Sequence, residues 1–498
     1  MSILLKIGFI AVLVFSFVFA SWSVAHDDII FSADIGRDFH LLRELDEKKI
    51  VLIGPRSSTG LFHGPFWTYL TYPAFVIGEG DPIVMGWYFV LLAVLFVIAN
   101  YFIAKDLFGK LPAAFFAAMS ALYTAYHASS MFSPLGAMFF IPLFFYLFIK
   151  YIRTKKFKFL VLNIIVGGII LQFQLALGVP FLILSVGYYV FTILRKGNKK
   201  HLLAFLLLPV LVSNFIIFDL RHENLYLNKV FGFVTVEEKG ELYNYAGLIR
   251  DRINIAFTGV EVLRNDTYGY LNLIFFVTII ILCVVLIKEN KNRDIYLAFL
   301  YFYFGFFVLS FINKGPILYF YTFPMFPLIF LIMASFLNTK FKKYLIVPLI
   351  MILIINMSNA INDIEGYSDK IGKDAYSWKF LREASEKMLE ENDFGYFVYS
   401  PDSVAYEGRY AAIFVTEQNG KGSYYVKKPI TYVLSAPTPE NDFITGDEWW
   451  IKNKVNIQSD PVSVIKFENG YKLKKYNLSP EEIAAPLDPQ VDTGLHFR

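Results

Sequence analysis

The feature that most constrains this chain is a series of apolar runs, each close to the length that crosses a membrane. A transmembrane helix needs about 20 predominantly apolar residues. Hydrophobic residues make up 56% of the chain and charged residues only 18%, whereas soluble domains average roughly 45–50% and about 25%. The sequence therefore predicts a polytopic α-helical membrane protein with about eleven spans. The runs are 3–20, 83–104, 111–127, 134–151, 158–173, 178–194, 202–220, 270–287, 295–312, 316–336 and 343–359.

Charge and cysteine content exclude two other classes of protein. The formal net charge is only +4, and a nucleic-acid-binding protein would carry a clustered basic face. We therefore expect no nucleic acid among the partners. The one cysteine, Cys283, lies inside an apolar run. A disulfide framework needs paired cysteines, so any external domain must fold without one.

Lysine and arginine set the orientation of the spans, because cytoplasmic loops carry an excess of both. The short loops near 128–133 and 174–178 carry none, and the loop near 313–315 carries only Lys314. The alternate loops are basic, so we predict a multi-pass protein of the cytoplasmic membrane with a cytoplasmic amino terminus and an extracytoplasmic carboxyl end. The basic loop residues are Lys105, Lys110, Lys150, Arg153, Lys155, Lys156, Lys158, Arg195, Lys196, Lys199, Lys200, Lys288, Lys291, Arg293, Lys340, Lys342 and Lys343. The alternative for the first run is a cleaved signal peptide, since Ser23-Val24-Ala25 offers small residues at a cleavage position.

Two parts of the chain follow from this topology: a transmembrane domain, 1–361, and an extracytoplasmic soluble domain, 362–498. The external loop 21–82 is too long to be a simple connector, and long ordered loops are usually functional. For the soluble domain we predict an α/β fold. Its expected elements are an amphipathic helix over 375–392, strands near 395–400, 409–415, 423–434 and 462–476, and a hairpin turn at Asn469-Gly470.

The first external loop holds the most informative polar cluster. Asp34, Arg37 and Asp38 follow Ser32 at a spacing of i, i+3 and i+4, which places all three on one face of a helix. A carboxylate beside a guanidinium can accept a proton while the guanidinium holds an anion. The alternative is structural, with Asp34 or Ser32 capping the helix and Arg37 forming a solvated ion pair.

Further along the same loop, a turn-rich stretch containing Arg56 leads to His63 and then to the aromatic segment 66–77. This segment is too short to span and suits a helix lying in the membrane interface. His63 either binds substrate or is an ordinary polar residue of the interface.

The ends of two later runs add polar groups on the predicted external side. Asp219, Arg221 and His222 close one run, and Lys314 precedes a segment containing Tyr321. These cations would suit a phosphate group at the outer membrane face. The alternative is plain anchoring of helix ends in the interface.

These motifs resemble the GT-C superfamily of membrane glycosyltransferases, and within it the family of protein O-mannosyltransferases and lipid A aminoarabinose transferases. The resemblance extends over the whole chain, and the segment 319–327 and Glu448-Trp449-Trp450 fit its prokaryotic members. Two departures are Ile35, where many relatives have an acidic or polar residue, and Phe320 before Tyr321, where His is expected. The motifs that carry the resemblance are Asp34-x-x-Arg37-Asp38, His63-Gly64-Pro65 and Phe218-Asp219-Leu220-Arg221-His222.

The resemblance implies an inverting transfer of a sugar from a polyprenyl-phosphate carrier to a lipid, glycan or protein acceptor outside the membrane. Asp34 takes the position of the catalytic carboxylate. Substrate binding is expected of Arg37, Asp38, Arg56, His63, Asp219, Arg221, His222, Lys314 and Tyr321. No cofactor is required by this chemistry; Asp27-Asp28 is the pair that would suit a divalent cation, without a convincing ligand set beside it.

Two other functional classes remain as alternatives. A transporter or lipid flippase would carry ionisable residues at mid-membrane and often repeated halves, but the runs are nearly free of charge between their ends. A non-catalytic anchor for the external domain would need only a single span.

Overall fold

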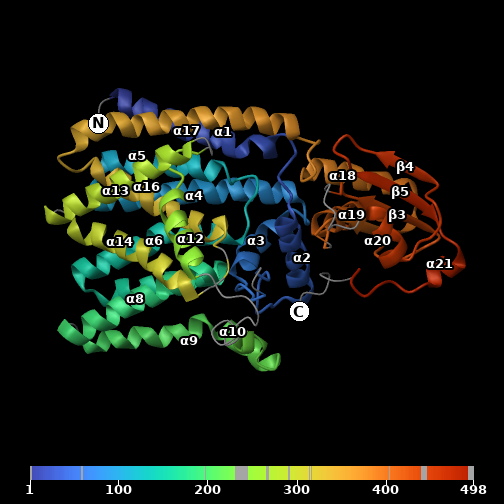
Figure 1. Ribbon diagram of the computed structural model, residues 1–498, viewed down its shortest axis with the longest axis horizontal. Helices are drawn as coiled ribbons and strands as arrows, with labels where there is room; N and C mark the ends of the chain where they lie inside the picture. Colours follow the sequence, from blue (N-terminus) through green and yellow to red (C-terminus); the bar gives the residue numbers. More distant parts are fainter. Residues whose placement is uncertain are drawn as a thin grey trace.

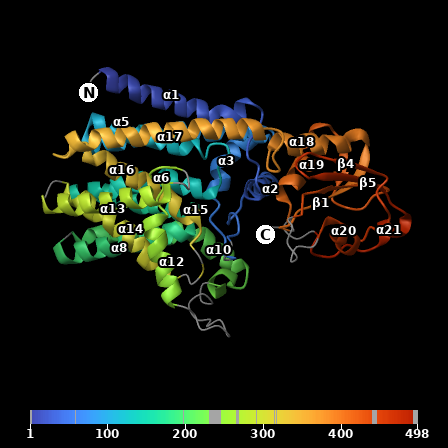
Figure 2. The same ribbon diagram turned by 45° about the horizontal axis from the view of Figure 1, so that its top comes forward.

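The computed structural model has two parts, a bundle of long helices and a smaller mixed sheet domain at one end of the bundle (Figure 1). The structure describes residues 3–57, 60–196, 198–229, 245–264, 268–289, 292–312, 315, 317–402, 404–438 and 446–491. Helices α1 and α17 lie along one side of the bundle, as the turned view also shows (Figure 2). The short helices α2 and α3 lie between the bundle and the sheet domain.

Each of the eleven predicted runs contains helix in its described part, and within the described residues eight helical segments have the length and hydropathy of a membrane span. The run 202–220 forms a pair of helices bent by 40°, η1–α9 (Lys199–Leu211) and α10 (Ser213–Arg221). The remaining two, α5 (Lys110–Ala125) and α7 (Phe157–Phe173), are shorter, with 16 and 17 residues. The chain is thus a multi-pass membrane protein, while the number of eleven spans stays a prediction. The eight are α1 (Ile3–Ala25), α4 (Pro82–Phe108), α6 (Ser133–Thr154), α8 (Leu175–Lys196), α13 (Gly269–Lys288), α14 (Arg293–Leu309) with η3 (Ser310–Ile312), Tyr319–Phe336, which comprises α15, η4 and α16, and α17 (Lys342–Lys370).

The sheet domain contains a five-stranded sheet in the order β2-β1-β3-β5-β4. Strand β1 pairs in parallel with β2 and β3, whereas β5 is antiparallel to β3 and β4. The predicted hairpin is confirmed, because Gly470 adopts a φ of 86° in the turn between β4 and β5. The strands are β1 (Asp393–Tyr399), β2 (Gly422–Tyr424), β3 (Ile430–Ser435), β4 (Ser463–Lys466) and β5 (Lys472–Asn477), and the helices are α18 (Trp378–Glu386), α19 (Tyr406–Gln418), α20 (Asp447–Trp450) and α21 (Pro480–Ala484).

One predicted strand is wrong, since 409–415 lies within helix α19. The segment is rich in residues that favour strands, but α19 is buried on most of its circumference, from Glu407 to Ala412 and again at Val415 and Thr416. A helix buried on nearly all sides shows no polar stripe, so periodicity alone does not separate it from a buried strand.

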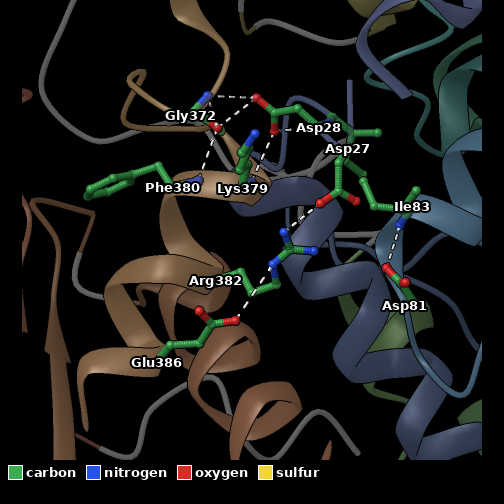
Figure 3. A network of polar contacts seen from close by, with 11 residues as sticks. Asp27, Asp28, Asp81, Ile83, Gly372, Lys379, Phe380, Arg382 and Glu386 are labelled. Atoms are coloured by element: carbon green, nitrogen blue, oxygen red, sulfur yellow. Dashed lines mark hydrogen bonds and ion pairs between the residues drawn. The ribbon is translucent and has the colours of Figure 1, made fainter. Parts of the chain in front are cut away.

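A polar network fastens the sheet domain to the end of α1, as Figure 3 shows. The buried Asp28 carboxylate accepts hydrogen bonds from Ser377 Oγ at 2.7 Å and from the backbone N–H groups of Lys379 and Gly372 at 3.1 and 3.2 Å. Next to it, Asp27 forms a 2.5 Å ion pair with Arg382 of α18. Both carboxylates that were considered for a cation are therefore engaged in holding the two parts of the molecule together.

Both oxygens of the Asp28 carboxylate accept hydrogen bonds, and in asparagine one of them is replaced by an NH₂ group, which cannot accept. We therefore expect Asp28→Asn to weaken the attachment of the sheet domain by about 2–3 kcal/mol. Hydrogen exchange of the backbone amides of 371–382 measures the change as a lower free energy of local opening. Asp27→Asn is the matched control, because its pair with Arg382 is half exposed and such pairs contribute about 0–1 kcal/mol. Equal protection in the two variants would contradict the assigned role of Asp28.

Candidate functional site

Helix α2 (Ala33–Lys48) presents the first predicted motif. Its apolar face is buried, and Phe39 lies against Tyr410 of α19 with ring centroids 4.9 Å apart. Gly36 makes this contact close, since a Cβ there would lie 2.6 Å from the backbone nitrogen of Glu407. His40 Nε2 also donates a hydrogen bond to the carbonyl oxygen of Tyr406 at 3.1 Å. The sheet domain therefore fixes the position of α2 from the side opposite the membrane bundle.

The three motif residues lie together as predicted. Arg37 Nη1 is 2.6 Å from Asp34 Oδ1, and Arg37 Nη2 is 3.2 Å from Asp38 Oδ1. Ser32 occupies the N-cap position and Asp34 lies within the first turn, so Asp34 is not the capping residue. The side chain of Asp34 is 51% exposed, whereas that of Arg37 is 16% exposed. One carboxylate is thus accessible while its arginine partner is largely buried.

Asp38 forms the buried half of this cluster, with a side chain only 9% exposed. Burial raises its pKa to about 6, and the Arg37 charge opposes that rise. Asp38 Oδ2 and Arg37 Nε are both buried without a hydrogen-bond partner among the described residues. Arg37, and to a smaller extent Trp67, favour the ionised form of Asp38.

His63 lies near enough to Arg37 for the charge of that arginine to affect the pKa of its imidazole. Burial is the larger cause, and together they lower the pKa of His63 to about 3, so its imidazole is neutral at physiological pH. Its backbone is fixed by two hydrogen bonds, from its own N–H to Pro55 O at 2.9 Å and from the N–H of Gly54 to His63 O at 2.8 Å. The Nδ1 atom has no partner among the described residues.

The loop that carries His63 is pressed against the helix bundle. A Cβ at Gly64 would lie 1.6 Å from Gln172 Oε1 of α7, so position 64 admits glycine only. Gln172 Nε2 donates to Asn214 Oδ1 at 2.8 Å, and Asn214 Nδ2 donates to Leu52 O at 2.9 Å. Asn214 of α10 thus connects the first loop with Gln172 of α7. After this loop the segment 66–77 forms a helix, α3 (Phe66–Ile77).

The other predicted site residues differ in their exposure and in their hydrogen-bond partners. The side chain of Arg56 is exposed, and that of Tyr321 is buried. The two carboxylate oxygens of Asp219 accept the backbone N–H groups of Tyr226 and Leu227 at 2.6 and 3.1 Å, so Asp219 caps a short turn of helix.

At the end of α10, Arg221 is exposed, and the ring of His222 stacks on Phe218 with centroids 4.0 Å apart. Lys314 lies outside the described residues. The segment after α10 reaches the first loop, because Lys229 Nζ donates to Gly60 O at 2.9 Å.

The residue most clearly missed by sequence reasoning is Tyr406, at the first position of α19. Burial raises the pKa of its hydroxyl, and the charges of Arg37 and Arg56 oppose the rise, so Tyr406 lies close to both cations. Its neighbour Glu407 is buried and has a pKa raised by burial to about 7. No local motif marks either residue, because both reach the site only when the sheet domain packs on α2. The contact residues His40 and Tyr406 are 366 positions apart in the sequence.

No set of three or more His, Cys, Asp or Glu side chains in the described part of the chain is arranged to hold a metal ion. What the cluster offers is an accessible carboxylate, a largely buried arginine, an exposed arginine and a neutral imidazole. Such a set can take a proton from a hydroxyl group and hold an anion in the same place.

Comparison with known proteins gives a likeness of fold. No family model matches the chain, and no curated protein matches it in sequence. Among solved structures it is similar to ArnT from Cupriavidus metallidurans bound to undecaprenyl phosphate, with a TM-score of 0.57, 10% identity, and coverage of 98% of this chain and 100% of that one. ArnT from the same organism in the apo state matches with a TM-score of 0.56, 12% identity, and coverage of 97% and 99%. The predicted polytopic helical fold with a small carboxyl-terminal sheet domain is confirmed, and it is similar to the fold of ArnT.

Proposed function

We propose, on the premise of this shared fold, that the protein is a membrane glycosyltransferase that takes its sugar from a polyprenyl-phosphate donor. The fold supports the proposal because one ArnT structure holds undecaprenyl phosphate. The observation that carries it is the half-exposed Asp34 carboxylate, held 2.6 Å from a largely buried arginine. We further propose that transfer is inverting and that the acceptor is a hydroxyl group on a lipid, a glycan or a protein.

The transfer would be a single displacement at the anomeric carbon. Arg37 binds Asp34 Oδ1, so Asp34 Oδ2 is the atom that would take the proton from the acceptor hydroxyl. The acceptor oxygen forms its bond to the anomeric carbon on one side, and the bond to the phosphate oxygen breaks on the other. The polyprenyl phosphate leaves as an anion and needs no proton, which agrees with a single accessible carboxylate. Nearby cations stabilise its developing charge.

For the phosphate we propose Arg37 and Arg56, whose charges both act on the Tyr406 hydroxyl, and also Arg221, His222 and Lys314, as the sequence motifs suggested. Arg56→Ala should raise the KM for the donor by about tenfold, because a charge-assisted hydrogen bond to phosphate contributes about 1.5–3 kcal/mol. Arg221→Ala should act in the same direction. Lys49→Ala serves as control, since Lys49 is 69% exposed and forms an ion pair with Asp46 of α2. Donor saturation curves at fixed acceptor measure the change; unchanged KM values would remove these arginines from the phosphate site.

We also propose that the first loop and the sheet domain face the outside of the cytoplasmic membrane, with the amino terminus inside. The support is the basic character of the opposite loops and the direct contact of α2 with α19. In a Cys283→Ser background, cysteines introduced at Ser57 and Glu468 should both react with an impermeant maleimide added to intact cells. Labelling of one site only after the cells are broken would contradict this topology.

The function is tested by incubating membranes that contain the protein with a panel of radiolabelled polyprenyl-phosphate sugars and then identifying any labelled product. Membranes with the Asp34→Asn variant are the control for transfer by other enzymes. A labelled lipid, glycan or protein that depends on Asp34 supports the proposal and identifies sugar and acceptor together. Movement of the labelled carrier between leaflets without any new glycosidic bond would favour the transporter alternative instead.

A further inference from the structure

A polar cavity of about 510 Å³ lies in the bundle and has no residue in common with the Asp34 cluster. Its walls come from the last turns of α17, from the segment that follows α12 (Tyr245–Thr258), and from the start of α15. The volume lies within the range of about 300–1,000 Å³ that is usual for small-molecule sites. The lining that matters for the argument consists of Glu261, Arg264, Tyr319, Asn359, Asp363 and Tyr367.

The cavity lies at the level of lipid headgroups. Helix α17 has 29 residues and is therefore about 44 Å long, whereas the hydrocarbon core of a bilayer is about 30 Å thick. Lys342 and Lys343 lie at the amino-terminal end of α17. A hydrocarbon core that begins there is crossed in about 20 helical residues, so its far boundary lies near Asp363. That end of α17 leads into the sheet domain (Figures 1 and 2).

Arg264 is held in place as a rigid wall of the cavity. Its guanidinium carbon lies 3.9 Å above the centre of the Tyr126 ring, and two asparagines of α17 fix its backbone. Asn356 Oδ1 accepts from Arg264 N–H at 3.0 Å, and Asn359 Nδ2 donates to Arg264 O at 2.5 Å. Its Nη1 atom is buried without a hydrogen-bond partner among the described residues. A buried donor of this kind is normally satisfied, so a ligand oxygen would complete it.

The charges of the lining favour a neutral ligand over an anion. Among the described lining residues, two carboxylates, Glu261 and Asp363, face one guanidinium, that of Arg264. A phosphate group would meet repulsion from both carboxylates. Hydroxyl groups suit the lining, because carboxylates and amide oxygens accept from them while Arg264 and the amide nitrogens donate to them. Tyr319, whose hydroxyl donates to Glu261 Oε2 at 3.2 Å, and Tyr367 add aromatic surface that can cover the C–H face of a ring.

We propose that this cavity is a saccharide-binding site, separate from the Asp34 site, that takes an uncharged hydroxyl-rich ring. Its position at headgroup level admits two sources of the same chemistry, the sugar headgroup of a glycolipid or a free sugar. The site would let the protein bind a sugar-bearing molecule whether or not transfer takes place at Asp34.

Saturation-transfer-difference NMR on the full-length protein in phosphatidylcholine nanodiscs provides the test. The soluble probes are methyl α-glucopyranoside, methyl α-mannopyranoside and methyl β-galactopyranoside, and the lipid probe is monogalactosyl diacylglycerol incorporated in the discs. We expect saturation transfer to ring protons of at least one probe. A signal from the lipid alone identifies a glycolipid headgroup as the source, and a signal from the methyl glycosides identifies a free sugar as sufficient.

Two variants locate the signal. Asp363→Asn and Arg264→Gln should each weaken binding by about tenfold or more, the usual effect of losing a hydrogen bond to a charged group. Asp369→Asn is the matched control, an exposed carboxylate on the same helix outside the cavity lining, and should leave the signal unchanged. Asp34→Asn should also leave it unchanged, which separates this site from the proposed transfer reaction. Thermal unfolding of each variant checks that the fold is kept.

Three results would overturn the proposal. One is no saturation transfer to any of the four probes. Another is a signal that Asp363→Asn and Arg264→Gln leave intact. The last is Arg264-dependent binding of inorganic phosphate, or of phosphatidylethanolamine added to the discs, in place of the sugars, which would reassign the cavity to a charged headgroup.

Discussion

Replacing Asp34 with asparagine is expected to lower sugar transfer by about 10²–10⁴-fold, the usual contribution of a positioned acid or base. Asparagine keeps nearly the same shape but can neither accept the proton nor carry the negative charge. The Asp34 side chain is half exposed, so loss of its ion pair with Arg37 should change stability by only about 0–1 kcal/mol. Initial rates with a hydroxyl acceptor, together with thermal unfolding in detergent, measure the two effects separately.

The matched control is Asp46→Asn, on the same helix and likewise in an exposed ion pair, with Lys49 at 3.0 Å. It should leave the rate near normal. Asp38→Asn should lower transfer less than Asp34→Asn, since Asp38 acts through Arg37. Near-normal turnover by the Asp34 variant would remove Asp34 from the reaction and leave it as a surface partner of Arg37.

The second large effect is expected from Arg37→Ala, which should lower both stability and transfer. Arg37 is the ion-pair partner of Asp38, whose side chain is only 9% exposed. Removing one member of a buried pair usually costs about 3–5 kcal/mol, because the other charge is left buried alone. The pKa of Asp38, about 6 with Arg37 present, should then rise further, so the loss of stability should grow as the pH is raised and Asp38 ionises. Transfer should fall by about 10²–10³-fold through loss of a cation at the leaving group.

A double variant separates the two roles of Arg37. Arg37→Ala combined with Asp38→Asn has no buried charge left to compensate, so most of the lost stability should return. The lost transfer should not return, because the cation is still missing. If the double variant regained both stability and activity, Arg37 would be a structural partner of Asp38 and would have no place at the leaving phosphate.

The membrane part of the fold could be predicted from sequence because its signal is local. A run of about 20 apolar residues can satisfy its backbone only as a helix in lipid, and each predicted run contains helix in its described part. The helix of the first loop was equally readable, since its apolar residues recur with helical spacing and become its buried face. The turn at Gly470 was marked by a dipeptide that tolerates positive φ.

The site was predictable only as far as its local spacing reached. Asp34, Arg37 and Asp38 lie together because one helix places them so. Their unequal exposure was not predictable, because it depends on α19, which packs on Gly36 from a distant part of the chain. The neutral state of His63 likewise depends on its burial and on Arg37, and neither is visible in the residues around it.

The attachment of the sheet domain also sets the order in which the molecule can mature. Asp28 and Ser377 are 349 residues apart, and His40 and Tyr406 are 366 apart. At a synthesis rate of about 5–20 residues per second, the first loop waits roughly 20–70 s before its partner exists. During that time α2 cannot bury the face that packs on α19. Helix α2 is thus synthesised early but is among the last elements to complete its packing. A nascent or truncated chain that lacks α19 would present Asp34 on an unsupported helix.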